Sequence, residues 1–467
     1  MIKTRLFIVF LACMTFAVLL PTAQAAGNPA VKETVDIVHK QLTDRMQEVK
    51  SKYNYKGVIL VENEEDDEEI RTLPLTVRAD FYCDQRVTMK TENSAQAIRM
   101  YKSATASIKA GTGKTDSKLE LDNQMILSRI QTTPRDLTLF EHASVQEMLS
   151  QREYELLKNP GDPLTFHRLF QKTKVNVGDK WATDDEALSG FLALDRVITN
   201  NVQLSLKSLA DGKAKIHITG RVKGESDDVI VEMTIKGTAT YDVKEQQVTW
   251  LRLDMDKKRR LGQMAPGFEG QVKVDVAVNM IEDNEAITRA AIKKKFKGKK
   301  LRFTFKLDSP GSAFVVTHEP GWRVIASEKE AAVLRFIRDG QLLAQCNAVQ
   351  LPSRPKDKPL TLDQFKKEIE KVVVEGRGRV VDTSKFKNAN GLSVMRLLVD
   401  GKQSDLDVRW LYYHLTSPDG RRMTVVFTIE QDLEDEFAAA DRLLVNDVRF
   451  KTKPITAAQR SSRNQNR

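Results

Sequence analysis

Between residues 196 and 280 the chain alternates between apolar and polar residues over five short stretches. Polar turns such as Asp211-Gly212 separate these stretches. The alternating apolar positions are Leu204, Leu206, Ile216, Ile218, Val229, Val231, Met233, Ile235, Leu251, Leu253, Met255, Val272, Val274, Val276 and Val278. Successive side chains of a β-strand point to opposite faces. The period of two therefore predicts an antiparallel meander of five strands with one apolar face.

The segment before the meander predicts further strands and two helices. Apolar residues between Val31 and Val49 recur at spacings of three and four, which is typical of an amphipathic helix. Residues 154–163 form a polar connection that ends in the turn Asn159-Pro160-Gly161-Asp162-Pro163. Strands are predicted at 55–61, 73–82, 95–110 and 117–131, and a short helix is predicted near 184–194.

An acidic run separates the first two of these strands. Seven of the eight residues from Glu62 to Glu69 are acidic. A calcium-binding loop needs spaced ligands and a glycine at its sharp turn, and this run contains no glycine. We interpret the run as a solvated hairpin loop, with a calcium site as the alternative.

The pattern changes after residues 293–302. Thr361 and Gln364 form a capping-box pattern that predicts a helix over 361–373. A second helix is predicted over 432–446, with Asp432 as its N-cap and Leu433, Phe437, Ala440 and Leu444 facing inward. Strands are predicted near 303–307, 313–317, 333–338, 341–350, 393–399, 406–416, 422–430 and 448–450, and residues 454–467 predict a disordered basic tail.

The first 25 residues have the three zones of a cleavable export signal. Lys3 and Arg5 give a basic start, an apolar run extends to Leu20, and Ala23-Gln24-Ala25 supplies a small-x-small cleavage pattern. The apolar run is shorter than the roughly 20 residues that a membrane-spanning helix needs. We predict an exported protein, periplasmic or extracellular, with an uncleaved anchor and a lipoprotein signal at Cys13 as alternatives.

Basic residues outnumber acidic ones after this signal. Residues 26–467 contain 72 basic and 64 acidic side chains, a net charge of +8 that favours acidic partners. The strongest basic cluster consists of Lys293, Lys294, Lys295, Lys297, Lys299, Lys300 and Arg302. We interpret it as a solvated linker or a lysine-protected edge strand, with contact with an anionic envelope surface as the alternative. Phe296 is its lone aromatic residue, so we expect no nucleic-acid partner.

The residues that usually carry metal or nucleophilic chemistry form no motif. No two of the six histidines have the spacing of a zinc-binding helix, and Cys83 and Cys346 have no neighbouring Cys or His at metal-ligand spacing. We expect two buried thiols, with one long-range disulfide as the alternative. Metal sites and bound cofactors are not expected.

A glycine-rich segment needs separate consideration. Gly111-Thr112-Gly113-Lys114-Thr115 resembles the end of a phosphate-binding loop, but Ile108 stands where the first glycine is required. We therefore predict a hairpin turn rather than a nucleotide site. With no catalytic motif, we expect no enzyme activity. Carboxylate pairs such as Asp184-Asp185 leave an unrecognised hydrolase site open.

The first of two family resemblances rests on Val177-Gly178-Asp179-Lys180-Trp181, followed by a helix and the meander. This arrangement resembles large secreted proteins of planctomycete bacteria. Residues 53–280 also look like the half-barrel of LolA-like periplasmic carriers, in which a curved antiparallel sheet can enclose an apolar ligand. The resemblance implies an apolar-ligand face formed by Val231, Met233, Ile235, Leu251, Leu253, Val274 and Val276.

The second resemblance covers residues 303–450. Pro320-Gly321-Trp322 in an early turn and Trp410-Leu411-Tyr412-Tyr413 in a central strand, together with the order of elements, are similar to the PsbP-like α/β sandwich. That family implies a binding or assembly module rather than an enzyme. A generic α+β domain is the alternative.

Together these patterns predict an α+β protein whose N-terminal part is a curved antiparallel β-sheet, or half-barrel, with a few helices. The C-terminal part is predicted to be an α/β/α sandwich with an antiparallel sheet. The predicted divisions are a signal peptide at 1–25, domains at 27–292 and 303–453, a basic linker at 293–302 and a tail at 454–467. The expected function is noncatalytic binding or scaffolding at the cell envelope. The alternatives are a periplasmic carrier of lipid or another apolar ligand, and a secreted hydrolase.

Overall fold

The computed structural model describes most of the chain between Thr34 and Lys451. The described residues are 34–39, 45–62, 70–118, 124–134, 136–144, 146–262, 266–282, 284–297, 303–307, 312–338, 341–355, 357–374, 378–403 and 406–451. The predicted signal peptide, the predicted tail at 454–467 and acidic residues 63–69 lie outside them.

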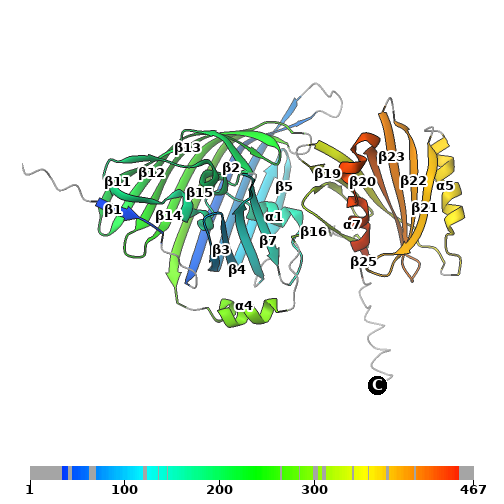
Figure 1. Cartoon of the computed structure of the whole chain (residues 1–467), viewed down its shortest axis with the longest axis horizontal. Helices are drawn as coiled ribbons and strands as arrows, with labels where there is room; N and C mark the ends of the chain where they lie inside the picture. The colour runs from blue at the N-terminus through cyan, green and yellow to red at the C-terminus, as the bar shows by residue number, and fades with distance from the viewer. Residues whose placement is uncertain are drawn as a thin grey trace, which may run out of the picture.

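The first half of the chain forms a curved antiparallel sheet of 13 strands (Figure 1). The strand order is β7-β6-β4-β3-β2-β15-β14-β13-β12-β11-β9, with β5 paired to β4 and β10 paired to β12. The bounds are β2 Met46–Glu62, β3 Ile70–Lys90, β4 Ser94–Ala110, β5 Gly113–Lys118, β6 Met125–Thr132, β7 Thr138–Ser144, β9 Lys180–Ala182, β10 Arg196–Asn200, β11 Gln203–Ala210, β12 Lys213–Ser226, β13 Val229–Asp242, β14 Gln247–Arg259 and β15 Gly267–Ile281.

The predicted meander is confirmed as strands β11 to β15. Each strand pairs antiparallel with the next. All fifteen apolar positions predicted to share a face are at most 8% exposed. The β11–β12 turn has positive φ at both Asp211 (52°) and Gly212 (70°), as a tight two-residue hairpin requires.

Three of the other strands predicted for this sheet are confirmed, and one is wrong. Strands β2, β3 and β4 confirm those predicted at 55–61, 73–82 and 95–110, and each is longer than predicted. Glu62 pairs with Ile70, so β2 and β3 form the predicted hairpin around the acidic run. The single strand predicted at 117–131 is wrong, because β5 ends at Lys118 and β6 begins at Met125.

The glycine-rich segment forms the hairpin turn that the sequence predicts. Ala110 ends β4 and pairs with Gly113, the first residue of β5. Gly111, between them, has a φ of 56°, which suits a tight turn.

The helix predicted between Val31 and Val49 is wrong. Residues Thr34–Ile37 form β1, which pairs with β8 (Lys172–Asn176), and the long strand β2 begins at Met46. Strand β2 lies between β3 and β15, so its backbone is hydrogen-bonded on both sides. Spacings of three and four give only a weak preference, which this long-range pairing overrides.

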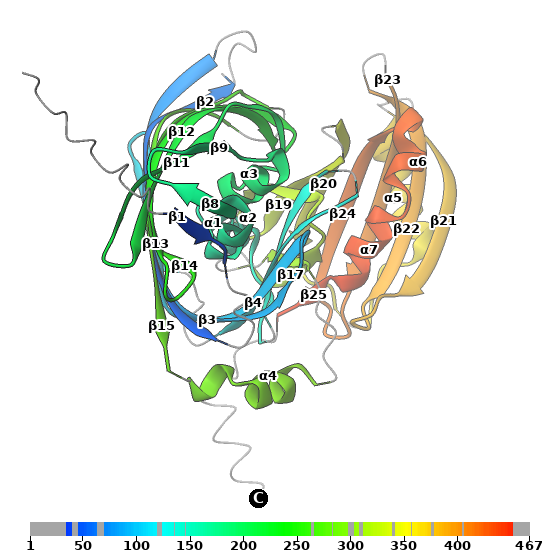
Figure 2. The same cartoon turned by 60° about the vertical axis from the view of Figure 1, so that its left-hand side comes forward.

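The chain fills the concave face of its own sheet with helices α1 (Gln151–Leu157), η1 (Pro163–Thr165), α2 (Phe166–Leu169) and α3 (Asp185–Leu192). Figure 2 shows these helices inside the curve of the sheet. Helix α3 confirms the helix predicted near 184–194. Helix α1 replaces part of the predicted polar connection, and the capping box of Ser150 and Glu153 is the signal that identifies it.

The second half of the chain contains a three-stranded and a seven-stranded antiparallel sheet. The first has the order β16-β17-β25 and the second the order β18-β19-β20-β24-β23-β22-β21. The bounds are β16 Phe305–Leu307, β17 Phe314–His318, β18 Trp322–Ser327, β19 Ala331–Arg338, β20 Gln341–Leu351, β21 Arg379–Lys387, β22 Ser393–Gln403, β23 Leu406–Thr416, β24 Arg422–Glu430 and β25 Arg449–Phe450. The predicted strands are confirmed, whereas edge strands β18 and β21 were not predicted.

Helices cover the two faces of the seven-stranded sheet (Figure 1). Helix α5 (Leu362–Val374) confirms the predicted helix and its capping box, in which Thr361 and Gln364 hydrogen-bond each other's backbone N–H groups. The helix predicted at 432–446 is interrupted. It forms η3 (Gln431–Leu433), α6 (Glu434–Phe437) and α7 (Ala440–Asp447), with Ala438 at a φ of 50°.

The predicted N-cap Asp432 is also wrong, because it lies within η3 and Glu430 precedes that helix without a side-chain cap. The inward residues Phe437, Ala440 and Leu444 are confirmed as buried, and Leu433 packs partly buried against them. Among the described residues, no helix is both long enough and apolar enough to cross a membrane.

Candidate functional site

The seven residues of the predicted apolar-ligand face lie together on the concave side of β13, β14 and β15. Cross-strand pairing places Leu253 beside Val274 and Leu251 beside Val276. All seven are at most 4% exposed. They belong to one core cluster with the aromatic residues of α2 and α3.

The chain's own turn at Gly161 lies directly on this face. A Cβ atom at Gly161 would be 3.1 Å from Leu251 Cδ2 and 3.4 Å from Val274 Cγ1. Gly161 N–H donates to the carbonyl of Phe191 at 2.7 Å, which ties the turn to α3. The turn predicted from composition therefore closes the apolar face.

Two hollows adjoin this part of the sheet. One, lined by His39, Lys90 and Gln247, has a volume of about 30 Å³, which is room for about two water molecules. The other is an open groove of about 530 Å³ beside Met233, and most of the residues along it are polar or charged, such as Arg221 and Lys258. Neither has the size and apolar lining that a lipid chain needs.

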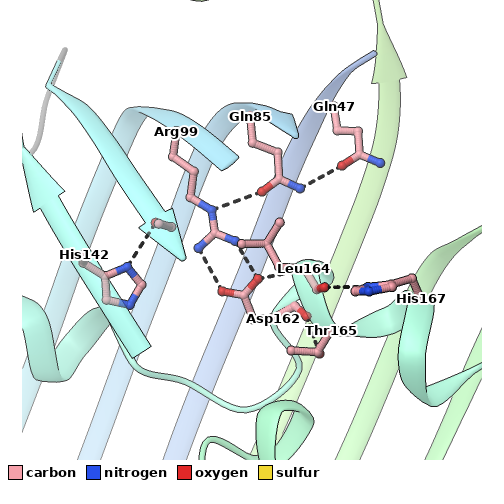
Figure 3. A network of polar contacts seen from close by, with 9 residues as sticks. Gln47, Gln85, Arg99, His142, Asp162, Leu164, Thr165 and His167 are labelled. Atoms are coloured by element: carbon pink, nitrogen blue, oxygen red, sulfur yellow. Dashed lines mark hydrogen bonds and ion pairs between the residues drawn. The ribbon is translucent and has the colours of Figure 1, made fainter. Parts of the chain in front are cut away.

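Five polar side chains form a buried chain of hydrogen bonds beside the apolar face, and Figure 3 shows four of them: Gln47, Gln85, Arg99 and Asp162. Arg99 on β4 donates to Asp162 twice, from Nη1 to Oδ2 at 2.9 Å and from Nη2 to Oδ1 at 2.5 Å. Arg99 Nε donates to Gln85 Oε1 at 3.1 Å. Gln85 Nε2 then donates to Gln47 Oε1 at 2.8 Å, and Gln47 Nε2 donates to Gln247 Oε1 at 2.9 Å. We call these five residues the Arg99–Asp162 network.

Local sequence explains the position of Asp162. It precedes Pro163, the first residue of η1, and its Oδ1 accepts a hydrogen bond from Leu164 N–H at 2.9 Å. Thr165 Oγ1 donates to the Asp162 carbonyl at 2.6 Å. An aspartate before a proline is a common start of a short helix. The sequence therefore contained a signal for this cap, although not for its partner Arg99.

The charges of the network stabilise each other. Burial opposes ionisation of Asp162, but the charge and hydrogen bonds of Arg99 hold its pKa below the ordinary value. Burial likewise opposes the charge of Arg99, while Asp162 keeps the Arg99 pKa above its ordinary value. The arrangement is that of a fully paired buried ion pair, which fixes the η1 turn to β4.

His142 lies near Ser128, so we asked whether these two residues could form a catalytic triad with Asp162. Its Nδ1 lies 3.0 Å from Ser128 Oγ, while its Nε2 has no partner among the described residues. A triad requires the second ring nitrogen to bond a carboxylate, and Asp162 is instead bonded to Arg99. Ser128 is fully buried, so a substrate has no route to its hydroxyl. Burial and the charge of Arg99 lower the His142 pKa to about 3, so the ring is neutral at pH 7.

The cysteines and the carboxylate pair that the sequence analysis considered have structural roles in the described part of the chain. Cys83 and Cys346 are buried free thiols, as expected. Burial raises the pKa of Cys83 to about 12. Asp184 caps helix α3 by accepting from Ala187 N–H at 2.7 Å. No group of three or more His, Cys, Asp or Glu side chains in the part of the chain that the structure describes could hold a metal ion.

The predicted basic segment is partly helical rather than an irregular linker or a strand. Helix α4 (Arg289–Phe296) begins at Thr288, whose Oγ1 accepts from Ala291 N–H at 3.2 Å. Ile292 and Phe296 pack against a buried cluster that contains Met46 and Ile98. The predicted residues Lys293, Lys294, Lys295 and Lys297 are exposed, whereas Lys299, Lys300 and Arg302 lie outside the described residues.

Comparisons with known proteins identify no family. No protein-family model matches this chain, and no curated protein matches it. Neither comparison therefore supports the predicted resemblance to secreted planctomycete proteins.

Solved structures give only weak similarities. Cyanobacterial PsbP (CyanoP) from Synechocystis has 14% identity and a TM-score of 0.25, over 32% of this chain and 92% of its own. The T6SS immunity protein TplEi from Pseudomonas aeruginosa has 8% identity and a TM-score of 0.21, over 55% of this chain and 92% of its own. Salmonella typhi OmpF has 7% identity and a TM-score of 0.13, over 84% and 98% of the two chains. At these scores the similarities carry no functional argument.

Proposed function

We propose that this protein is exported and works at the cell envelope as a noncatalytic binding or scaffolding protein, held at an anionic surface by helix α4. The predicted signal at 1–25 supports export, and the net charge of +8 after that signal favours acidic partners. The observation that carries the proposal is the division of α4 into an anchored apolar side and a free basic side.

The apolar side of α4 is already used within the protein. Ile292 and Phe296 are four residues apart, on one face of the helix, and both pack against the buried cluster around Met46. The helix is therefore held against the sheet and leaves its lysines exposed. Lysines in its last turn also face the partial negative charge of the helix C-terminus, which stabilises the helix.

The filled concave face favours binding or scaffolding over the carrier alternative. The apolar residues that a carrier would offer to lipid are covered by the turn at Gly161 and by helices α2 and α3. A bound lipid would have to displace these elements and expose their apolar side chains to water. Neither of the two hollows beside the sheet offers an apolar volume of suitable size.

The test measures co-sedimentation of the protein, from residue 26 onward, with vesicles of phosphatidylglycerol and of phosphatidylcholine. We expect binding to the anionic vesicles alone, which weakens as salt rises because exposed charges are screened. Replacing Lys293, Lys294, Lys295 and Lys297 with glutamine removes roughly 1 kcal/mol of attraction per lysine. The affinity for anionic vesicles should fall at least tenfold.

A matched variant controls for the change in net charge. Lys207, Lys213, Lys215 and Lys236 are exposed lysines of the meander and can be replaced with glutamine in the same way. This variant should bind anionic vesicles nearly as tightly as the wild type. Equal losses in the two variants would assign the binding to overall charge and would refute the role of α4.

A further inference from the structure

A further cavity lies in the other half of the molecule, at one end of the seven-stranded sheet. It is enclosed by the turn between β23 and β24 and by the loop that leads into α5. Its volume is about 210 Å³, which exceeds the space that a few water molecules occupy. Its polar lining includes Arg354, His414, Thr416 and Arg422. We call this hollow the Arg354–Arg422 cavity.

Toward the described residues, the two arginines use few of their hydrogen-bond donors. A guanidinium group has five N–H donors. Arg422 Nε donates to the carbonyl of Pro352 at 2.6 Å. Arg354 Nη2 lies 3.4 Å from Glu368 Oε1, and the Glu368 side chain is 55% exposed. Asp419, a carboxylate of the turn between β23 and β24, is paired with Arg421 at 2.7 Å.

The positive charges of the cavity are therefore poorly compensated. Burial lowers the pKa of Arg422, and the charge of Arg354 lowers it further, while Glu368 opposes these effects. Two guanidinium groups that repel each other across a hollow create a favourable position for an anion between them. A bound anion would remove the repulsion and satisfy the unused donors.

His414 and Thr416 add uncharged donors to the same wall. His414 is 1% exposed, and its Nε2 has no partner among the described residues. Its Nδ1 lies 3.3 Å from Thr416 Oγ1, and its ring packs on Phe365 at 5.5 Å between centroids. Burial and the charges of Arg422 and Arg354 lower the His414 pKa to about 4, so the ring is neutral at pH 7. When Thr416 donates to Nδ1, the ring proton lies on Nε2, which becomes a donor.

We propose that the Arg354–Arg422 cavity binds a small organic phosphate, whose phosphate oxygens accept from Arg354, Arg422 and His414. Donors from three separate side chains suit the several oxygens of a phosphate better than the two of a carboxylate. The remaining wall contains Leu360, Pro359 and Pro418, which would contact the uncharged part of the ligand. This site is independent of helix α4 and of the function proposed above.

The pattern of backbone contacts indicates that the cavity is preformed. Arg354 N–H donates to the carbonyl of Gly420 at 3.0 Å, which joins the loop to the turn. A Cβ atom at Gly420 would lie 2.4 Å from the Arg354 carbonyl oxygen, and the φ of Gly420 is 87°. Only glycine allows this close approach. The two arginine-bearing segments are thus held together by the backbone, without a ligand.

The test is calorimetric titration of the protein, from residue 26 onward, with glycerol 3-phosphate, inorganic phosphate and glycerol. We expect glycerol 3-phosphate to bind more tightly than inorganic phosphate, and glycerol not to bind. Arg354→Met and Arg422→Met should each weaken binding of glycerol 3-phosphate at least tenfold, because each removes charge-assisted hydrogen bonds. His414→Phe, which keeps an aromatic ring beside Phe365, should weaken it several-fold.

Arg442→Met is the matched control, because Arg442 is an exposed residue of α7 that does not line the cavity. It loses the same charge and should bind glycerol 3-phosphate like the wild type. Thermal melting establishes that each variant is folded, and Thr416→Val provides a second, milder change in the same wall. No binding of glycerol 3-phosphate at millimolar concentration, or equal binding by Arg422→Met and Arg442→Met, would overturn the proposal. If inorganic phosphate bound as tightly as glycerol 3-phosphate, the proposal that the ligand is an organic phosphate would be overturned.

A competition experiment identifies the source of the phosphate. If the natural ligand is a lipid headgroup, vesicles that contain phosphatidic acid should displace glycerol 3-phosphate from the wild type and from the α4 glutamine variant alike. If it is a soluble phosphate, neither protein should release glycerol 3-phosphate to the vesicles. Displacement from both proteins and displacement from neither are each consistent with the proposed phosphate site. Displacement of glycerol 3-phosphate from the wild type alone would instead reflect binding of the vesicles through α4.

Discussion

At the scale of single residues, Asp162 is a buried carboxylate that is held from two sides. Its carboxylate accepts from Arg99 and from Leu164 N–H, and its side chain is 9% exposed. Removing one member of a buried ion pair leaves the other charge without compensation, which usually costs more than the pair contributes. The same side chain thus holds strand β4 and turn η1 together.

We expect Asp162→Asn and Arg99→Met each to lower the free energy of unfolding by about 3–5 kcal/mol. The double variant Arg99→Met/Asp162→Asn should lose less than the sum of the two, because it leaves no unpaired charge. Urea denaturation at pH 7 measures all three. Additive losses would show that the two charges do not depend on each other.

The same ion pair determines how the stability of the protein depends on pH. The folded pKa of Asp162 lies below its unfolded value of about 3.9. The stabilisation is therefore complete above that unfolded value and is lost as the pH falls toward the folded pKa.

At the scale of elements, Gly161 determines how closely the turn approaches β14 and β15. Gly161→Ala should destabilise the protein for two reasons. The φ of 78° is unfavourable for other residues, and the added Cβ would be 3.1 Å from Leu251 Cδ2. Gly178→Ala is the matched control, because Gly178 has a φ of 97° and no atom within 4 Å of the added Cβ. Thermal unfolding should show a loss larger by about 1–3 kcal/mol for Gly161→Ala. Equal losses would mean that the contact with Leu251 is easily relieved.

The way in which each element pairs or packs explains whether it could be predicted from the sequence. The meander could be predicted because strict alternation matches only a strand with one buried face, and that face is buried. Residues Thr34–Ile37 and Met46–Glu62 could not, because their pairing partners β8 and β15 are distant in sequence. Helix α1 was detectable from its capping box. The break at Ala438 depends on a backbone conformation that alanine seldom adopts.

The candidate sites were less predictable than the elements. The exposed lysines of α4 were evident because they are consecutive in sequence. The Arg99–Asp162 network and the Arg354–Arg422 cavity each join segments that are far apart, and no short motif records such a combination. Burial is what gives these common residues distinctive chemistry, and burial follows only from the fold.

At the scale of the whole molecule, the two halves contact each other through specific groups. Arg323 Nη2 donates to Asp227 Oδ1 at 2.8 Å, and Val324 N–H donates to Gln151 Oε1 at 3.0 Å. Lys306 N–H donates to the carbonyl of Leu149 at 2.9 Å. These contacts join Leu149, helix α1 and the β12–β13 turn to β16 and β18.

Arg323→Ala tests how firmly these contacts couple the halves. The ion pair with Asp227 is partly exposed, so its loss should cost about 1 kcal/mol, or roughly fivefold in a local opening equilibrium. Hydrogen exchange should accelerate by that factor at the amides of β16 and β18 and remain unchanged in β22. Arg442→Ala, which removes an exposed arginine that takes no part in this ion pair, should change neither. Unaltered exchange at β18 in Arg323→Ala would mean that the ion pair does not hold the halves together.

The pairing of β2 with β15 also has a kinetic consequence. Met46 pairs with Ile281, so the central ladder of the large sheet joins segments from opposite ends of that half. Closing so long a loop costs entropy before any contact compensates for it, and sheets rich in such pairings fold slowly. During synthesis, which proceeds from the N-terminus, β2 is complete long before β15 emerges. We therefore expect refolding from denaturant to be slow and prone to aggregation, and a chaperone that shields unpaired strands to raise the yield.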